Sequence, residues 1–346
     1  MIRTLTAFTL FALAAPVSAV TPALPPAPAP SEIVAAAPKA DWVARPASDL
    51  LVMDLTPPDR GPGQASTKAK PRRVTIQLMP PPFSAGWIGN IRKLAAAHWW
   101  DGLSVNRVQD NYVAQWGDAD GEDKAKARAL PGGVRVGDER EYQTTVNDVL
   151  RNMLGVDGSE EVEAVKSGMS DEPANNASLV RMLMTDPYAS RTFFLEGWPT
   201  GFEGAGLSSR VWPVHCYGMV GVGRNLSPDT GSGAELYTVI GHAPRHLDRN
   251  IALVGRVIEG IEHLSSLPRG TGALGFYEMP EERTTIVSVR LGSEVSALPA
   301  YEYFSTETAT FARYADARAN RRDPFFIKPA GGADICNIPG PVRRVK

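Results

Sequence analysis

One stretch, residues 99–118, constrains the fold of this chain more than any other part of its sequence. It reads Trp-Trp-Asp-Gly-Leu-Ser-Val-Asn-Arg-Val-Gln-Asp-Asn-Tyr-Val-Ala-Gln-Trp-Gly-Asp. Val105 and Arg107 alternate at the period of a β-strand, and Val113 and Gln115 share one face of the strand that follows. If the two strands pair, Arg107 and Gln115 converge across them. The stretch therefore predicts a strand pair that places a fixed cation beside an amide.

The residues before this stretch predict a hairpin and a helix. Segments 50–55 and 74–78 are strand-like, and the Gly/Pro/Lys-rich residues 57–71 between them indicate an enlarged turn. Ser84 is a candidate N-cap for a helix that ends near Trp99. After Ser84, six residues at helical spacing predict one buried face of this helix, namely Trp87, Ile88, Ile91, Leu94, Ala95 and His98.

Residues 99–118 resemble the signature of the cyclophilins, a family of peptidyl-prolyl isomerases. The family order is an aromatic-Asp-Gly triplet, an arginine, an aromatic residue, an apolar residue and a glutamine. In this chain these places fall on Trp100-Asp101-Gly102, Arg107, Tyr112, Val113 and Gln115. The pattern resumes at 214–223, so the resemblance covers roughly residues 48–120 and 213–292.

The resemblance implies a mainly β fold, a closed eight-stranded barrel with two capping helices. The second helix is expected after residues 255–260, with Val257, Ile261 and Leu264 on one side. Residues 285–290 are expected to form the closing strand. We predict a cyclophilin-like domain over residues 42–295.

The resemblance also implies which residues act on a substrate. Rotation about an X-Pro bond is slow because amide resonance must be broken, with a barrier of about 18–20 kcal/mol. Arg107 is the implied catalytic residue, because its permanent charge and fixed donors favour the twisted amide. The implied substrate-binding residues are Tyr112, Val113, Gln115, Gly223, Arg224, Glu235, Tyr237, His246 and Leu247. The reaction needs no cofactor, no metal and no covalent intermediate.

Several positions depart from the family pattern. Glu235 stands where a glutamine is usual, Arg224 where an asparagine is common, and His246 where a tryptophan is common. A carboxylate at position 235 could pair with Arg107 and either orient it or sequester it. The sequence therefore leaves two functions open, an isomerase acting on proline-containing polypeptides and a non-catalytic peptide-binding chaperone or scaffold.

The family pattern lapses over residues 121–212, which we interpret as an insertion. A charged loop at 121–140 gives way to helical periodicity at Val146, Val149, Leu150 and Met153, and then to residues 179–184. We expect a partly helical insertion that packs on the barrel or caps the cleft. Residues 296–346 are predicted to be a C-terminal tail with a short helix within 300–320 that carries Phe311 and Tyr314.

The N-terminus has the pattern of a secretory signal over residues 1–19. Arg3 precedes an apolar run at 5–15, and Val17-Ser-Ala19 matches a small-x-small cleavage site. We expect a periplasmic or secreted protein without membrane attachment after cleavage. Residues 20–41, between the signal and the predicted domain, are expected to be an Ala/Pro-rich linker. In an oxidising compartment Cys216 and Cys336 are a plausible disulfide, although two unpaired thiols remain an equal alternative.

The composition argues against nucleic-acid binding. The 346 residues carry a formal net charge of −2, and no run of Lys and Arg dominates one face. His242 and His246 have the spacing of zinc ligands on a helix, but Pro244 lies between them and no third ligand is evident. We predict no metal site and a monomeric protein.

Overall fold

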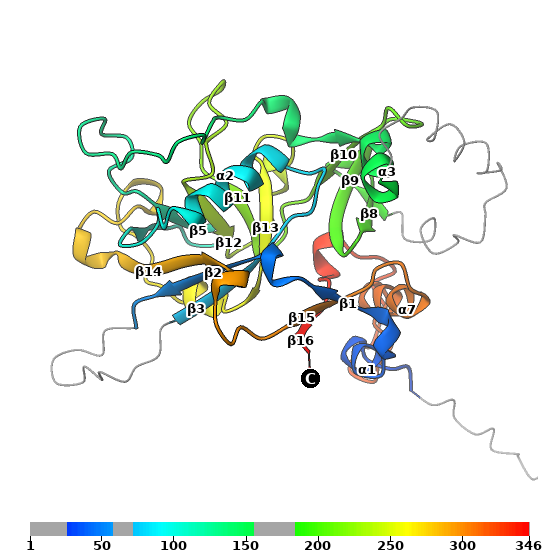
Figure 1. The fold of residues 1–346 in the computed structure, drawn as a ribbon. Coiled ribbons are helices and arrows are strands. Elements are labelled where there is room, and N and C mark those ends of the chain that lie inside the picture. Colours follow the sequence, from blue (N-terminus) through cyan, green and yellow to red (C-terminus); the bar gives the residue numbers. More distant parts are fainter. Residues whose placement is uncertain (1–25, 58–71, 156–183, 346) are drawn as a thin grey trace, which may run out of the picture.

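Eight antiparallel strands close into a barrel in the computed structural model (Figure 1), which describes residues 26–57, 72–155 and 184–345. Around the barrel the strands follow the order β11 (Met219–Val222), β12 (Leu236–Val239), β5 (Val113–Gly117), β4 (Ser104–Val108), β14 (Thr284–Leu291), β2 (Leu50–Leu55), β3 (Arg72–Leu78) and β13 (Leu253–Glu259). β13 pairs back onto β11, so the sheet has no free edge. The predicted fold class is confirmed.

The opening hairpin and the first helix form where the sequence predicts them. β2 and β3 pair antiparallel, with Leu51 opposite Ile76. Helix α2 (Ala85–Ala96) buries Trp87, Ile91 and the other predicted stripe residues up to Ala95 against the barrel. His98 does not belong to that stripe, because the chain leaves the helix before it and His98 is exposed. Ser84 occupies the N-cap position without a side-chain capping bond.

The second capping helix is much shorter than expected. Val257 lies on strand β13, and only Glu262–Ser265 form helix α6. Gly260 ends the strand with φ +85°, a conformation that glycine adopts without steric cost. A Cβ atom at this position would also lie 2.0 Å from the carbonyl oxygen of Arg73. Because β13 runs to Glu259 and the chain turns at Gly260, Val257 belongs to the strand and the helix begins only after the turn.

The insertion is partly helical, as expected, but most of its described part is a β-sheet that the sequence analysis did not predict. Only α3 (Val146–Leu154) follows the predicted periodicity, and residues 179–183 lie outside the described ranges. The described remainder forms a five-stranded antiparallel sheet in the order β6 (Thr144–Thr145), β10 (Arg210–Pro213), β9 (Trp198–Glu203), β8 (Ala189–Leu195) and β7 (Met184–Asp186). Figure 1 shows this sheet and α3 to one side of the barrel.

A tight turn explains the strands of the insertion. β8 and β9 are paired up to Leu195 and Trp198, which leaves Glu196 and Gly197 as a two-residue loop. Both loop residues have positive φ angles, +47° and +84°, as a type I′ hairpin turn requires. This hairpin was not predicted from the sequence.

The two ends of the described chain pack together instead of forming a tether and a loose tail. Strand β1 (Trp42–Arg45) pairs with β15 (Tyr301–Phe304), and β15 pairs with β16 (Val342–Arg344). Helix α1 (Pro30–Ala35) contacts α7 (Ala309–Ala319), so residues 30–35 are helical and not an extended linker. As predicted, α7 carries the buried Phe311 and Tyr314.

Aromatic rings join these terminal segments to the insertion. Phe304 of β15 stacks on Trp42 of β1 with ring centroids 5.1 Å apart. Phe311 of α7 contacts both Phe304, at 5.7 Å, and Phe194 of β8, at 5.2 Å. These rings belong to the same buried cluster as the barrel core. The N-terminal segment, the insertion and the C-terminal segment therefore share one core with the barrel.

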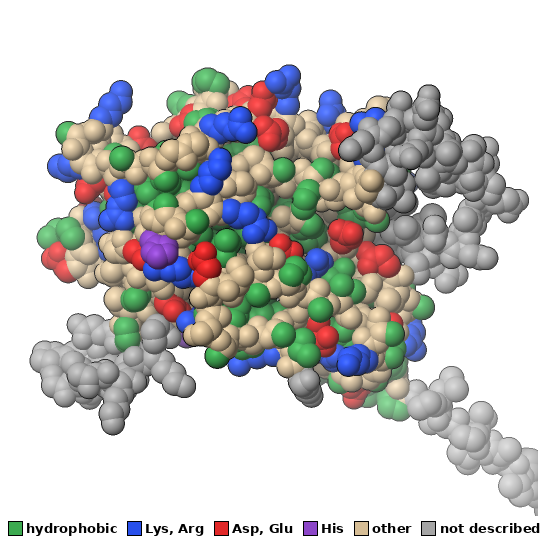
Figure 2. Space-filling model, viewed as in Figure 1, with side chains coloured by type: hydrophobic (Ala, Val, Ile, Leu, Met, Phe, Trp, Pro, Cys, Tyr) green, Lys and Arg blue, Asp and Glu red, His purple; other side chains and the backbone are tan. Residues whose placement is uncertain are grey.

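Cys216 and Cys336 are joined by a disulfide, with their Cα atoms 5.1 Å apart. The bond ties the C-terminal segment to the residues just before β11, across 120 positions of sequence. The predicted signal at 1–19 lies outside the described residues. Within the described ranges no helix has the length and apolar character needed to cross a bilayer. On the face in Figure 2, basic and acidic side chains are interspersed over the described surface.

Candidate active site

Arg107 and Gln115 face each other across strands β4 and β5, as the alternation predicts. Their Cα atoms are paired in the antiparallel register, and Arg107 Nη1 donates a hydrogen bond to Gln115 Oε1 at 3.0 Å. The register shifts by one residue between Val105 and Arg107, so β4 carries a bulge beside the site. A bulge of this kind re-aims a side chain relative to the regular strand.

The Arg107 guanidinium is half-buried and held from three sides. Nε donates to the carbonyl oxygen of Leu274 at 2.8 Å, and Nη2 donates to Gln109 Oε1. The guanidinium carbon lies 5.3 Å from the ring centre of Phe276 and 5.9 Å from that of Tyr112. Desolvation by these neighbours lowers the pKa of Arg107, which still remains a cation at neutral pH. A guanidinium has five N–H groups, of which three donate to the neighbours above and two have no acceptor among the residues that the structure describes.

A small hydrophobic cluster lies beside this cation and apart from the main core. Buried Val113, Tyr237 and Val239 form its base. Half-buried Tyr112, Leu247 and Ile251 pack against them, and we call these six residues the pocket cluster. It contains four of the substrate-binding residues that the family resemblance implies, namely Tyr112, Val113, Tyr237 and Leu247. Tyr112 belongs to the cluster and also lies against Arg107, so cation and cluster are adjacent.

Tyr237 lies between Gln115 and Gly221 of the two neighbouring strands. It pairs with Gln115 across β12 and β5. On the other side, a Cβ atom on Gly221 of β11 would lie 2.4 Å from the Tyr237 ring. The phenol oxygen is 3.0 Å from His215 Nε2. One end of the tyrosine thus belongs to the pocket cluster and the other end to a buried polar group.

The remaining predicted binding residues surround the cluster. The exposed His246 ring stacks on Tyr112 at 6.4 Å between centroids, next to Leu247. Gly223 donates its backbone N–H to the Glu235 carbonyl oxygen at 2.8 Å. Arg224 is turned to local backbone, donating to the carbonyl oxygens of Asn250 at 2.9 Å and Asn225 at 2.7 Å.

Glu235 does not pair with Arg107, contrary to the expectation from the sequence. Its Oε1 accepts a hydrogen bond from the backbone N–H of Asp118 at 2.6 Å, and its buried Oε2 has no partner among the described residues. Gly117 makes room for this arrangement, because it has φ +155° and carries no Cβ. Burial raises the pKa of Glu235 to about 7, against the opposing effect of the Asp118 N–H.

Several polar residues near the site were missed by the sequence analysis. Gln109 accepts a hydrogen bond from Arg107 and lies two positions after it, just beyond the end of β4, a spacing of two that the sequence pattern could have revealed. His215 lies in the apolar segment before β11, and nothing in that segment indicates a partner for it. Its partner Asp248, together with Arg245 and Asp186, completes a buried network. Long-range pairs of this kind leave no local sequence pattern.

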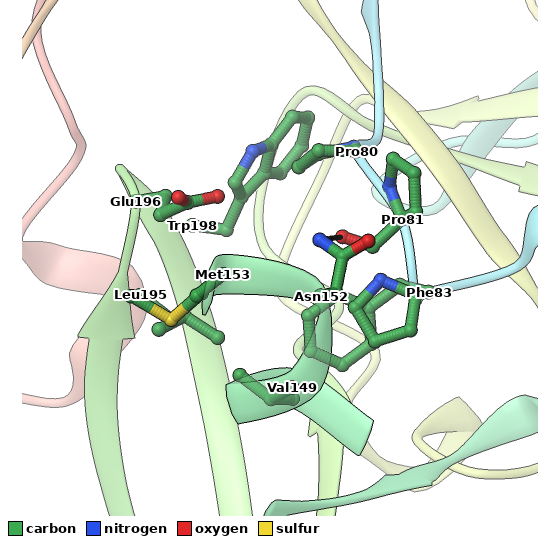
Figure 3. Close-up of a pocket in the computed structure, with 10 residues that line it drawn as sticks. Pro80, Pro81, Phe83, Val149, Asn152, Met153, Leu195, Glu196 and Trp198 are labelled. Atoms are coloured by element: carbon green, nitrogen blue, oxygen red, sulfur yellow. Dashed lines mark hydrogen bonds between the residues drawn. The ribbon is translucent and has the colours of Figure 1, made fainter. Parts of the chain in front are cut away.

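A hollow between the barrel and the insertion is lined by none of the predicted site residues. Figure 3 shows Pro80, Pro81 and Phe83 from the loop before α2 facing Asn152 and neighbouring residues of α3, with Leu195, Glu196 and Trp198 of the β8–β9 hairpin alongside. Asn152 Nδ2 donates to the Pro81 carbonyl oxygen at 2.9 Å. This hollow marks the contact between insertion and barrel.

Comparison with known protein families supports the resemblance on which the site was built. The family described as cyclophilin type peptidyl-prolyl cis-trans isomerase/CLD matches residues 73–291. The chain belongs to this family. The match begins in β3, ends in β14 and includes both strands of the Arg107–Gln115 pair, the pocket cluster and the whole insertion.

Individual relatives of this cyclophilin are distant. Peptidyl-prolyl cis-trans isomerase CYP23 of Arabidopsis thaliana is 39% identical over 75 residues, 21% of this chain. The chain spans about a third of the length of that curated relative, 32%. The crystal structure of cyclophilin AquaCyp293 from Hirschia baltica is 18% identical, with a TM-score of 0.57 over 89% of this chain and 97% of that one. This structural match extends the shared fold beyond the barrel.

Proposed function

We propose that this cyclophilin is a peptidyl-prolyl cis-trans isomerase that rotates X-Pro bonds in exported polypeptides and so assists their folding. Family membership and the barrel support an isomerase activity in general terms. The observation that carries the assignment to this site is the position of Arg107, a half-buried cation beside the pocket cluster with two N–H groups unpaired within the described part of the chain.

Arg107 acts on the amide nitrogen of the substrate proline. As the X-Pro bond twists, resonance is lost and the nitrogen becomes pyramidal, so that it can accept a hydrogen bond. An Arg107 N–H directed at that nitrogen stabilises the twisted state more than the planar one, which lowers the barrier. Gln115 and Gln109 hold the guanidinium in one orientation, so little reorganisation is needed during rotation.

The pocket cluster holds the proline ring while the preceding residue rotates. Val113 and Tyr237 form the base, and Tyr112 and Leu247 form the sides. Gln115 and the backbone at Gly223 contact the flanking peptide groups. The substrate class that fits is a polypeptide segment with one proline and an exposed backbone on either side of it.

The exported location rests on two observations of different kinds. Residues 1–19 have the pattern of a secretory signal, and Cys216 and Cys336 are bonded to each other. Structural disulfides are typical of the periplasm and the extracellular space and rare in reducing compartments. A cell-fractionation experiment with a tagged full-length chain tests this part, and a fully cytoplasmic, reduced product contradicts it.

The activity is tested with a short peptide containing one Ala-Pro bond, whose cis-to-trans rate is followed by a coupled assay. We expect the wild-type protein to accelerate isomerisation and Arg107→Ala to lose most of that rate. NMR exchange spectroscopy on the same peptide checks catalysis without a coupling enzyme. A wild type that produces no acceleration in either measurement contradicts the proposal.

A non-catalytic peptide-binding function is the second candidate, and one observation favours it. The segment around Leu274 and Phe276 lies against Arg107 and already occupies one of its donors. If this contact persists in solution, a proline peptide would bind the pocket cluster without reaching the guanidinium. Saturable peptide binding without acceleration of exchange would identify this function.

A further inference from the structure

A chain of five buried polar side chains runs from the insertion to the base of the pocket cluster. Arg245 makes a two-pronged contact with Asp186 of β7, at 2.7 Å and 2.9 Å, and donates from Nε to Asp248 at 2.7 Å. Asp248 contacts His215 Nδ1 at 2.9 Å, and His215 Nε2 contacts the Tyr237 hydroxyl at 3.0 Å. We call these residues the buried polar chain.

The partners in the buried polar chain fix the direction of each hydrogen bond. Asp248 accepts from Arg245 and from the backbone N–H of His215, so its carboxylate is ionised. The ionised carboxylate of Asp248 accepts a hydrogen bond from the Nδ1–H of His215. Complete burial lowers the pKa of the His215 imidazole and keeps it neutral. His215 Nε2 is then bare and can only accept, so the Tyr237 hydroxyl donates to it.

The side chains of the buried polar chain are almost fully shielded from solvent. The side chains of Asp186, Arg245, Asp248 and His215 are between 0% and 3% exposed, and Tyr237 is buried. In such surroundings a polar group that loses its partner is costly, so the geometry resists displacement of any one member. This rigidity extends to Tyr237, whose ring belongs to the pocket cluster.

Segments outside the barrel contact the end of the buried polar chain that is farthest from Tyr237. Asp186 belongs to the inserted sheet, and Asp334 of the C-terminal segment lies 3.5 Å from Arg245. Cys216, next to His215, is bonded to Cys336 in that same segment. Both appendages therefore meet the barrel at the residues that orient Tyr237.

We propose that His215 is a positioning residue that fixes Tyr237 as the base of the proline pocket, and that Asp186 of the insertion sets substrate affinity through it. The proposal rests on the isomerase function proposed above. It assigns the inserted sheet a role in shaping the pocket without placing any of its residues in contact with substrate.

A double-mutant cycle tests the proposal with Asp186→Asn, Tyr237→Phe and the combined variant. We expect each single change to raise KM for the Ala-Pro peptide, by about tenfold for Tyr237→Phe and about threefold for Asp186→Asn, with kcat within about twofold of wild type. The combined variant should be no worse than Tyr237→Phe alone. Additive effects, or an unchanged KM in Asp186→Asn, overturn the positioning role.

Glu203→Gln is the matched control. Glu203 lies on β9 of the same inserted sheet and contacts Arg249 Nη1 at 2.6 Å, but neither residue belongs to the buried polar chain. We expect its KM to equal that of wild type. A rise in KM equal to that of Asp186→Asn would show a general effect of loosening the insertion and would overturn the proposal.

A readout independent of turnover separates this inference from the proposed function. In ¹⁵N NMR spectra, His215 should be the neutral Nδ1–H tautomer, and its Nε2 resonance should shift in Tyr237→Phe and in Asp186→Asn but not in Glu203→Gln. If the wild-type protein has no isomerase activity, the proposed function is wrong. The double-mutant cycle is then measured with the dissociation constant of the peptide in place of KM. If the chemical shift of His215 Nε2 is unchanged in Asp186→Asn, or if His215 is protonated, the positioning role is wrong while the proposed function still stands.

Discussion

Gly117 and Glu235 fit together so closely that a Cβ atom on Gly117 would lie 2.0 Å from Glu235 Oε1. This fit places the carboxylate against the backbone N–H of Asp118 and away from Arg107. The unusual acidic residue of this cyclophilin is therefore a buried titratable group behind the β4–β5 pair that carries Arg107 and Gln115. Its protonation has consequences for stability that can be measured.

The first prediction concerns the pH dependence of stability. The pKa of Glu235 is about 7 in the folded chain and near 4.5 when exposed, so folding takes up a proton between these two values. Stability from this group is fully present below pH 4.5 and is lost as pH rises to about 7. A pKa difference of this size corresponds to about 3 kcal/mol.

Urea unfolding of Glu235→Gln at several pH values checks this prediction. Between pH 4.5 and 7, the unfolding free energy of wild type should fall as pH rises because Glu235 loses its proton. Glu235→Gln should lack this contribution to the fall. The exposed Glu203→Gln serves as control and should keep the wild-type slope. Equal slopes in wild type and Glu235→Gln would show that Glu235 titrates normally.

A second prediction concerns the group that orients Arg107. Gln115→Leu removes the acceptor of the Arg107 Nη1 bond while keeping a side chain of similar size. A guanidinium free to rotate is misplaced for part of the time, so kcat/KM for the Ala-Pro peptide should fall about tenfold.

The control for this change is Asp110→Asn, in the turn after β4. Asp110 forms an exposed ion pair with Arg269 at 3.0 Å and does not contact Arg107. Its loss should leave kcat/KM within about twofold, as is usual for surface pairs. Equal losses in both variants would indicate that the turn, and not Gln115, determines activity.

A third prediction concerns the bond between Cys216 and Cys336. The bond closes a loop of 120 positions, and long loops gain most from closure because the unfolded chain is restricted. Cys216→Ser combined with Cys336→Ser should lower the free energy of unfolding by about 3 kcal/mol. Wild type with a reductant should fall to the same value, and a reduced wild type as stable as the oxidised one would contradict the prediction.

A fourth prediction tests whether the terminal segments share the core of the barrel. Phe311→Ala removes a ring that contacts Phe194 of the insertion and Phe304 of β15, and it should cost about 4 kcal/mol in unfolding free energy. Phe325→Ala is the matched control, since Phe325 is 82% exposed and should change stability by less than about 0.5 kcal/mol. A small effect at Phe311 would mean that α7 contributes little to the folded core.

Local periodicity explains why much of the site could be predicted from the sequence. Alternation placed Arg107 and Gln115 on facing strands, and the family pattern brought Tyr112, Val113, Tyr237 and Leu247 together; all of these lie where expected. Such relations depend on neighbours within a strand pair or on a motif that the family shares.

Relations that depend on distant backbone could not be predicted. From its place in the family pattern, Glu235 was expected to be able to pair with Arg107. Its carboxylate instead turns to the Asp118 N–H, in space that the missing Cβ of Gly117 leaves open. In the insertion, the hairpin that turns at Glu196 and Gly197 was not predicted from the sequence. The bond between Arg245 and Asp186 joins residues 59 positions apart, and no local pattern predicts it.

The most direct test of the account is kcat/KM of Arg107→Ala relative to wild type for a peptide with one Ala-Pro bond, measured on protein shown to be folded by its unfolding curve. Removing a donor aimed at the transition state should lower kcat/KM by about 100-fold or more while leaving stability nearly unchanged. A folded Arg107→Ala variant with kcat/KM within about threefold of wild type would contradict the account.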